Sequence, residues 1–285
     1  MSDRQLSNSL VIGILRKCRY LALKAFSPFE QLLFKIGGIS GFPPAHLRRA
    51  AGATATPDGS SMQYLLLMKM VAGAKSSSSI LDIGCGCGML EMVLARYVTT
   101  GRIVGIDIHR PSLEWAKSNI SSKHPNIEFV HSDIYNRAYW PTGKKSAADF
   151  FAQFHSGTFD LVVAKSLLTH MLIDELQVYF EAIANNLTPG GKGLLSFFLL
   201  NEDQKRLQAE GRGAFALSPI NPSDPYSFRR RSAPSAAVGY DESFVKDLLG
   251  KSGLNSMDVI YGSWSGRLDA PLFQDILLVE KRLTI

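Results

Sequence analysis

The chain of 285 residues has few cysteines, no long apolar run and only a mild excess of one charge. Its three cysteines form no disulfide framework, and Cys85 and Cys87 have no matching Cys/His pair nearby to complete a zinc site. Residues 11–15 are apolar, but basic residues follow at once, which argues against a signal peptide and against a membrane span. These absences predict a cytoplasmic protein with no metal site.

The net charge of +6 suits an anionic substrate or a membrane surface, but it does not by itself indicate nucleic acid. Residues 11–34 are apolar and basic in turn, so they could lie on a membrane surface. The sequence favours a different role for them, a helical cap packed on the domain that follows. Stable anchoring to a membrane usually needs more basic charge or a second signal.

A short apolar run is followed by three alternating glycines and then by helical spacing. Residues 80–83 read as a buried strand, Gly84, Gly86 and Gly88 as a turn, and residues 89–98 as a helix. This order of elements brings backbone N–H groups close to a bound cofactor, because glycine lets the backbone approach the ligand. A tight strand–helix turn with no ligand is the alternative.

The acid at the end of this strand, Asp82, distinguishes the turn from a dinucleotide site. The spacing is D-x-G-x-G-x-G, whereas the dinucleotide fingerprint is G-x-G-x-x-G. A carboxylate in this place repels a pyrophosphate but suits an ammonium group. Two further acids, Asp107 and Asp133, end the next two predicted strands, and taken singly each could be a helix cap or a solvated turn residue.

Strand and helix patterns alternate from residue 80 to residue 199, which predicts a parallel sheet with helices on both faces. After the first strand, the predicted strands are residues 102–107, 127–131, 159–164 and 192–199, the last preceded by a turn at 189–191. We divide the chain into a helical N-terminal cap, residues 1–75, and one larger domain, residues 76–285. Within this domain, residues 201–239 are polar, proline-rich and basic, which predicts an irregular lid or a substrate-binding insertion.

Five segments taken in order resemble the successive motifs of class I S-adenosylmethionine-dependent methyltransferases. The resemblance implies a Rossmann-like α/β fold: a seven-stranded, mostly parallel sheet whose last strand is antiparallel. It also implies S-adenosylmethionine (AdoMet) as methyl donor and S-adenosylhomocysteine (AdoHcy) as product, with no metal. A closer resemblance is to a bacterial, type 11/12/25-like subgroup that methylates saccharides or secondary metabolites. The five segments are Leu81–Gly88, Gly105–His109, His131–Ile134, Phe159–Met171 and Leu187–Gly193.

The resemblance also implies which residues bind the cofactor. Asp107 would accept the ribose hydroxyls, Asp133 would accept the adenine amino group, and the acid before the glycine turn would meet the methionine ammonium or orient the loop. Two isoleucines would sandwich the adenine ring. The full predicted set is Asp82, Gly84, Cys85, Gly86, Gly88, Asp107, Ile108, Asp133, Ile134 and Lys165.

Methyl transfer to a hydroxyl needs a positioned nucleophile and benefits from a general base. His170 follows the fourth predicted strand and is the candidate base, with a helix cap or a backbone hydrogen bond as its alternative role. Tyr240, Trp264 and Arg267 are the candidate substrate-binding residues, although the last two could simply pin a turn.

The sequence therefore predicts methyl transfer to a hydroxyl of a saccharide or another small molecule. Methylation of nitrogen or carbon in a small molecule is one alternative, and a protein that binds AdoMet without catalysis is another. A nucleic-acid substrate is not expected, because no Asn/Asp-Pro-Pro-Tyr/Phe segment follows the fourth strand and no RNA-binding module is appended. Both a monomer and a homodimer are compatible with the sequence.

Overall fold

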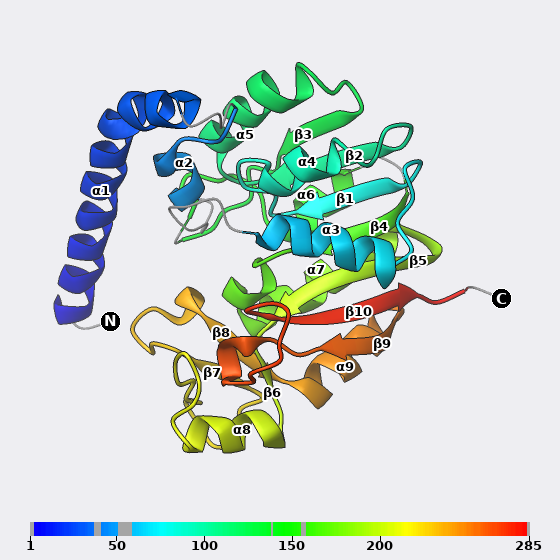
Figure 1. The fold of residues 1–285 in the computed structure, drawn as a ribbon. Helices are drawn as coiled ribbons and strands as arrows, with labels where there is room; N and C mark the ends of the chain where they lie inside the picture. Colours follow the sequence, from blue (N-terminus) through cyan, green and yellow to red (C-terminus); the bar gives the residue numbers. More distant parts are fainter. Residues whose placement is uncertain (1–2, 37–40, 51–58, 138, 155–157, 284–285) are drawn as a thin grey trace.

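The computed structural model describes residues 3–36, 41–50, 59–137, 139–154 and 158–283, with side chains from residue 18 onward (Figure 1). Its centre is a seven-stranded sheet in which β10 runs antiparallel to both of its neighbours. The predicted fold class is confirmed. In sheet order the strands are β3 (Ile127–His131), β2 (Arg102–Asp107), β1 (Ser79–Ile83), β4 (Phe159–Ala164), β5 (Leu187–Phe197), β10 (Asp275–Lys281) and β9 (Leu254–Ile260).

Alternate residues of each strand face opposite sides of the sheet, so the sheet builds two cores. Ile80 and Ile103 face one core, while Leu81 and Val104 face the other. Three helices cover the first core, namely α3 (Ser60–Met70), α4 (Met89–Leu94) and α5 (Arg110–Ala116), the last continued by a π-helical turn at Lys117–Ser121. The second core is covered by α6 (Ala147–Gln153), α7 (Ile173–Asn186) and α9 (Glu242–Lys251).

The strand β5 begins earlier than the sequence predicts. Pro189-Gly190-Gly191 reads as a turn before a strand at residue 192, but these residues lie inside β5. The pairing with β4 shifts register between Phe159 and Leu161, so the extra residues bulge out of the ladder. Because of this bulge, the residues that read as a turn lie within one continuous strand.

The segment 201–239 is folded, where the sequence predicts an irregular stretch. It contains α8 (Glu202–Ala209), β7 (Tyr226–Phe228), a 3-10 turn at Pro234–Ala236 and the start of β8 (Val238–Asp241). With β6 (Leu199–Leu200), the strands β7 and β8 make a second sheet of three strands in the order β6-β8-β7. A third core lies beside it, formed by Phe198, Leu200, Leu217, Ala237 and Trp264.

Asp275, at the start of β10, joins this part of the molecule to the main sheet. Its buried carboxylate accepts hydrogen bonds from Leu199 N and Trp264 Nε1, both at 2.7 Å on Oδ2, and from Gly262 N at 2.7 Å on Oδ1. Burial raises the pKa of Asp275 to about 6, against the opposing effect of these three donors. One side chain thus fixes the start of β6, the loop after β9 and the start of β10.

The N-terminal region contains two helices that pack on each other, α1 (Asp3–Ile36) and α2 (Ala45–Ala50). The sequence of residues 27–34 predicts a separate helix with Pro28 near its first turn, but α1 continues through this proline and bends in its second half (Figure 1). Buried Arg48 holds the pair together through an ion pair of 2.8 Å with Glu30 and by lying 4.8 Å from the centre of the Phe42 ring. In the described part of the chain, no helix is long and apolar enough to cross a membrane.

Asp275→Asn should lower the free energy of unfolding by about 1–3 kcal/mol, the cost of leaving a buried polar group unsatisfied. An amide has one accepting oxygen, so its NH₂ group would face at least one N–H donor. Urea denaturation would measure the loss. Asp247→Asn, on the exposed side of α9, is the matched control and should leave stability unchanged; equal stability of both variants would contradict the assigned role.

Candidate functional site

The glycine turn after β1 has the tight backbone that its sequence predicts. Gly84, Gly86 and Gly88 all have positive φ, at 85°, 59° and 79°. Glycine is required at the third position, because a Cβ there would lie 2.6 Å from Ile120 Cδ1 and 3.0 Å from Phe129 Cζ. The turn is therefore pressed against the π-helical end of α5 and against β3, and its shape is fixed by packing.

Asp107 ties this turn to the loop after β2. Its Oδ2 accepts from Gly86 N at 2.8 Å, and its Oδ1 accepts from His109 N at 2.7 Å. A carboxylate oxygen has two lone pairs, so each oxygen retains one for a further donor. The same side chain that shapes the turn can therefore also accept hydroxyl groups.

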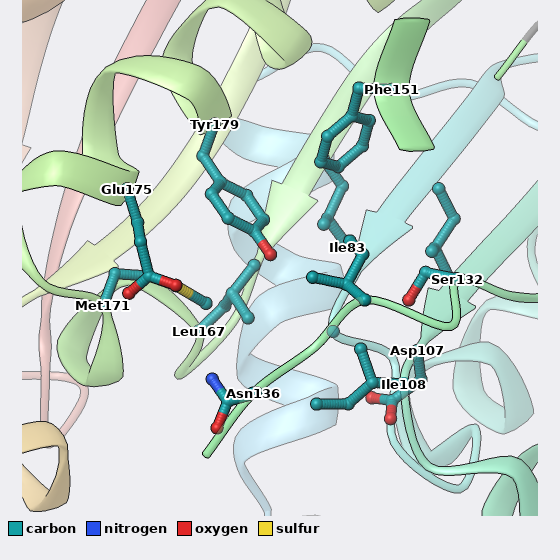
Figure 2. A pocket seen from close by; sticks show the side chains of 13 residues that line it. Ile83, Asp107, Ile108, Ser132, Asn136, Phe151, Leu167, Met171, Glu175 and Tyr179 are labelled. Carbon is teal, nitrogen blue, oxygen red and sulfur yellow. The ribbon is translucent and has the colours of Figure 1, made fainter. Parts of the chain in front are cut away.

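A cavity of about 50 Å³ lies at the carboxyl ends of β1, β2 and β3, between them and α7 (Figure 2). Its wall is mostly apolar, and Asp107, Glu175 and Tyr179 supply polar groups. Four of the predicted cofactor residues line it: Gly84, Asp107, Ile108 and Ile134. The remaining lining residues are Ile83, Ile106, Ser132, Asn136, Phe151, Leu167, Met171, Glu175 and Tyr179.

Asp82 lies under the turn and is buried beside a second buried acid, Glu91 of α4. Burial raises the pKa of Asp82 to about 7 and raises the pKa of Glu91 well above its ordinary value. The Asp82 carboxylate raises the pKa of Glu91 further, whereas a hydrogen bond with Glu91 lowers the pKa of Asp82. Lys165 opposes both shifts. Burial in a shared site thus disfavours the state in which both carboxyl groups are charged.

The sequence analysis missed Glu91, because an acid in the first turn of a helix ordinarily reads as a favourable surface charge. The feature that could have indicated its burial is its position on the inward face of α4, between Leu90 and Leu94. Among the described residues, Asp82 Oδ1 has no hydrogen-bond partner other than the Glu91 carboxyl group. A buried acceptor of this kind is suited to an ammonium group or a water molecule.

The Asp133 carboxylate also accepts a hydrogen bond from within the protein. Its Oδ1 accepts from Trp140 Nε1 at 3.1 Å, and its own φ is 45°. Trp140 packs edge-on against the rings of His109 and His131, so it bridges the loops after β2 and β3. The second carboxylate oxygen is left for an additional donor. Sequence reasoning missed Trp140, which lies in a segment without periodicity.

Lys165 leaves the end of β4 toward α3. Its Nζ donates to Ser60 Oγ at 2.6 Å and lies 5.4 Å from the centre of the Tyr64 ring. Cys85 is buried, and desolvation with several nearby acids raises the pKa of its thiol. These residues support the turn from beneath, and neither lines the cavity of Figure 2.

His170 lies in the 3-10 turn after β4, Leu168–His170, one residue before the cavity-lining Met171. Its Nδ1 lies 2.8 Å from the carbonyl oxygen of Ser235, and its ring packs edge-on against Tyr139. A carbonyl only accepts, so Nδ1 carries the proton and Nε2 holds the lone pair of the neutral ring. Burial lowers the pKa of His170, while the backbone hydrogen bond acts in the opposite direction.

Residues 80–191 match a family model described as "Methyltransferase domain". Residues 80–191 are therefore a methyltransferase domain of the S-adenosylmethionine-dependent class I type. A ribosomal protein L11 methyltransferase from Caulobacter is 32% identical over 65% of this chain and 60% of its own length. A ubiquinone biosynthesis O-methyltransferase from Escherichia coli is 24% identical over 62% of this chain and 65% of its own. The chain thus spans less than two thirds of these curated relatives.

The fold agrees with a solved methyltransferase. A Burkholderia thailandensis 1,6-didemethyltoxoflavin-N1-methyltransferase with bound S-adenosylhomocysteine has a TM-score of 0.51 at 16% identity, over 79% of this chain and 80% of that one. The predicted family, and AdoMet as the cofactor of that family, are confirmed. The residues at the strand ends fit this cofactor, since a glycine turn with positive φ and a carboxylate with spare lone pairs meet at the cavity.

Two predicted substrate residues of the methyltransferase domain lie in its interior. Tyr240 is fully buried and donates to Met171 O at 2.9 Å, so it anchors the loop that carries His170. Trp264 is also fully buried and stacks on Phe215. The prediction of direct substrate contact is therefore wrong for both in this structure, because burial leaves neither ring a surface to offer.

Arg267, the third predicted substrate residue, is partly exposed. Its guanidinium lies 4.2 Å from the centre of the Tyr261 ring and donates to Ser265 Oγ at 3.1 Å. It lines an open cleft of about 560 Å³ together with Arg206 and Arg212, apart from the cavity of Figure 2. Over the described residues, no group of three or more His, Cys, Asp or Glu side chains could hold a metal ion.

Asp107→Ala should lower the affinity for AdoHcy at least about 10-fold, since it removes a charged acceptor and the tie that shapes the turn. Isothermal titration calorimetry measures the affinity, and circular dichroism checks the fold. Glu128→Ala, an exposed acid on the adjacent strand β3, is the control and should bind as the unchanged protein does. Equal affinity in both variants would remove Asp107 from the site.

Proposed function

We propose that the protein transfers a methyl group from AdoMet to a hydroxyl group of a small molecule, a saccharide or a secondary metabolite, with His170 as general base. The observation that carries this proposal is the hydrogen bond from His170 Nδ1 to the Ser235 carbonyl. It fixes the tautomer in which Nε2 can accept a proton. A lowered pKa keeps the ring neutral, and therefore basic, near pH 7.

The cofactor, when bound, supplies a methyl group on a positively charged sulfur, which is already a strong electrophile. The chain must therefore bind the cofactor, orient the acceptor and exclude water. In this proposal Asp107 holds the ribose hydroxyls, Asp133 with Ile108 and Ile134 holds the adenine, and the turn with Asp82 holds the amino-acid end. Each of these acids retains an acceptor position in its present hydrogen-bonding arrangement.

The segment 201–239 takes part in this proposal as a lid that positions the base. Ser235 belongs to it, and its carbonyl is the group that fixes the His170 ring. The segment packs into a folded core with Trp264 and Leu217. A rigid segment of this kind can hold the imidazole of His170 in one orientation.

The O-methyltransferase among the relatives supports a hydroxyl acceptor. The L11 methyltransferase relative points instead to a protein acceptor. Labelled methyl transfer from AdoMet to panels of phenols, saccharides and purified ribosomal proteins, with mass spectrometry of the methylated atom, distinguishes them. An O-methylated small molecule is the expected product. N- or C-methylation, protein methylation, or AdoHcy binding without any transfer would each contradict the proposal.

His170→Ala should lower kcat about 10²-fold or more on the hydroxyl acceptor found in this way, the usual scale of general-base assistance. Its affinity for AdoHcy should stay unchanged, because no predicted cofactor contact is removed. His124→Ala, a histidine in the loop before β3, is the matched control and should keep full activity. Full activity of the His170 variant would mean that positioning alone drives transfer.

The pH profile gives a second test. Protonated imidazole cannot accept a proton, so activity is lost as pH falls through the pKa of His170. Because burial lowers this pKa from its ordinary 6.5, the acid limb of kcat/KM should have its midpoint below pH 6.5. The residual activity of His170→Ala should lack this limb; an identical limb in the variant would assign the titration to another group.

A further inference from the structure

One face of α1 packs on the rest of the molecule through polar and aromatic contacts. Ser27 Oγ lies 2.7 Å from His46 Nδ1, and Glu30 Oε2 accepts from Ala45 N at 2.8 Å. Phe34 meets the Phe42 ring edge-on. These contacts, with the ion pair between Glu30 and Arg48, define which side of α1 faces the protein.

The opposite face of α1 is apolar and exposed. Six large apolar side chains on it have exposed fractions between 51% and 74%. Their spacing of mainly three and four residues places them in one stripe along the helix. The stripe is continuous across the bend, because the rings of Phe26 and Phe29 touch edge-on with centres 5.2 Å apart. Its members are Leu21, Phe26, Phe29, Leu32, Leu33 and Ile36.

The charges around this stripe are of one sign. Arg19, Lys24 and Lys35 are exposed on α1. Glu30 is the single acid between residues 4 and 36, and it is paired with Arg48 on the packed side. The exposed surface of the described part of α1 therefore combines an apolar stripe with basic flanks and carries no acid.

We propose that this stripe docks the protein on the surface of an anionic lipid bilayer, with α1 lying in the plane of the interface. Apolar side chains enter the headgroup boundary while flanking lysines and arginines meet lipid phosphates. A second copy of the chain is a poorer occupant, since pairing two α1 stripes would bring the basic flanks of both copies together without acids to balance them.

The placement of α1 gives this docking a direction. Figure 1 shows the helix on the side of the molecule toward which β1 and β5 point, which is the side of the strand ends that form the cavity. The sequence alone favours a helix wholly used as a cap. The structure shows that capping uses only one face, and so leaves the other available.

The first experiment is co-sedimentation of the full chain with large unilamellar vesicles. Vesicles of phosphatidylcholine with about 30% phosphatidylglycerol are compared with pure phosphatidylcholine, at low and at high salt. We expect binding to the anionic vesicles at least 10-fold tighter than to the neutral ones, and weaker binding as salt rises. No binding to the anionic vesicles would overturn the proposal.

The second experiment uses the double variant Phe29→Glu, Leu33→Glu, which places two acids in the stripe and leaves the packed face untouched. We expect its partition onto anionic vesicles to fall at least 10-fold, with unchanged circular dichroism. The control is Met257→Glu, a comparable change at an exposed methionine of β9, which should bind vesicles as the unchanged protein does.

Two results of this comparison would count against the proposal. Equal vesicle binding by the double variant and the control would exclude the stripe as the docking surface. A concentration-dependent dimer in sedimentation velocity that the double variant abolishes, together with no vesicle binding, would assign the stripe to a second copy. Neither result involves methyl transfer, so both are independent of the proposed reaction.

Discussion

The carboxylate of Asp107 is the constraint on which the site depends. Two loops that follow two different strands, the glycine turn after β1 and the loop at His109, are held by its two oxygens. The packing of Gly88 against Ile120 and Phe129 closes the turn from the other side. Between these two restraints the strand ends have little freedom, so the cavity is preorganised.

The two buried acids beneath the turn add an electrostatic constraint to these packing restraints. Asp82 and Glu91 share a low-dielectric space with Lys165 nearby, so their proton occupancy depends on what lies above them. A cationic group near Asp82 would favour the ionised form. In the proposed site, binding of a cationic group there would be linked to the protonation of this pair, independently of His170.

The sheet was predictable because its signals are local. The predicted strands at residues 102–107, 127–131 and 159–164 have the bounds that the structure gives them, since short apolar runs between turn residues define buried strands. The glycine turn and the acids at the strand ends follow from the same local pattern.

The parts that sequence reasoning missed depend on contacts between distant residues. Tyr240 reaches Met171, 69 positions earlier, and Asp275 gathers donors from Leu199 and Trp264. Nothing local in the sequence around these residues indicates their partners. Periodicity also cannot predict which face of a helix is exposed. The pattern of α1 shows that its apolar residues share one side, but not which side packs on the rest of the protein.

The hydrogen bond that fixes the His170 ring uses the main chain of residue 235, so its chemistry is independent of the side chain there. Substitutions across the segment 201–239 can therefore alter the surface presented to an acceptor while the imidazole keeps its tautomer, provided the path of the backbone is preserved. In the proposed mechanism, the fold thus separates the choice of acceptor from the maintenance of the base. Such an arrangement allows specificity to diversify without rebuilding the catalytic apparatus.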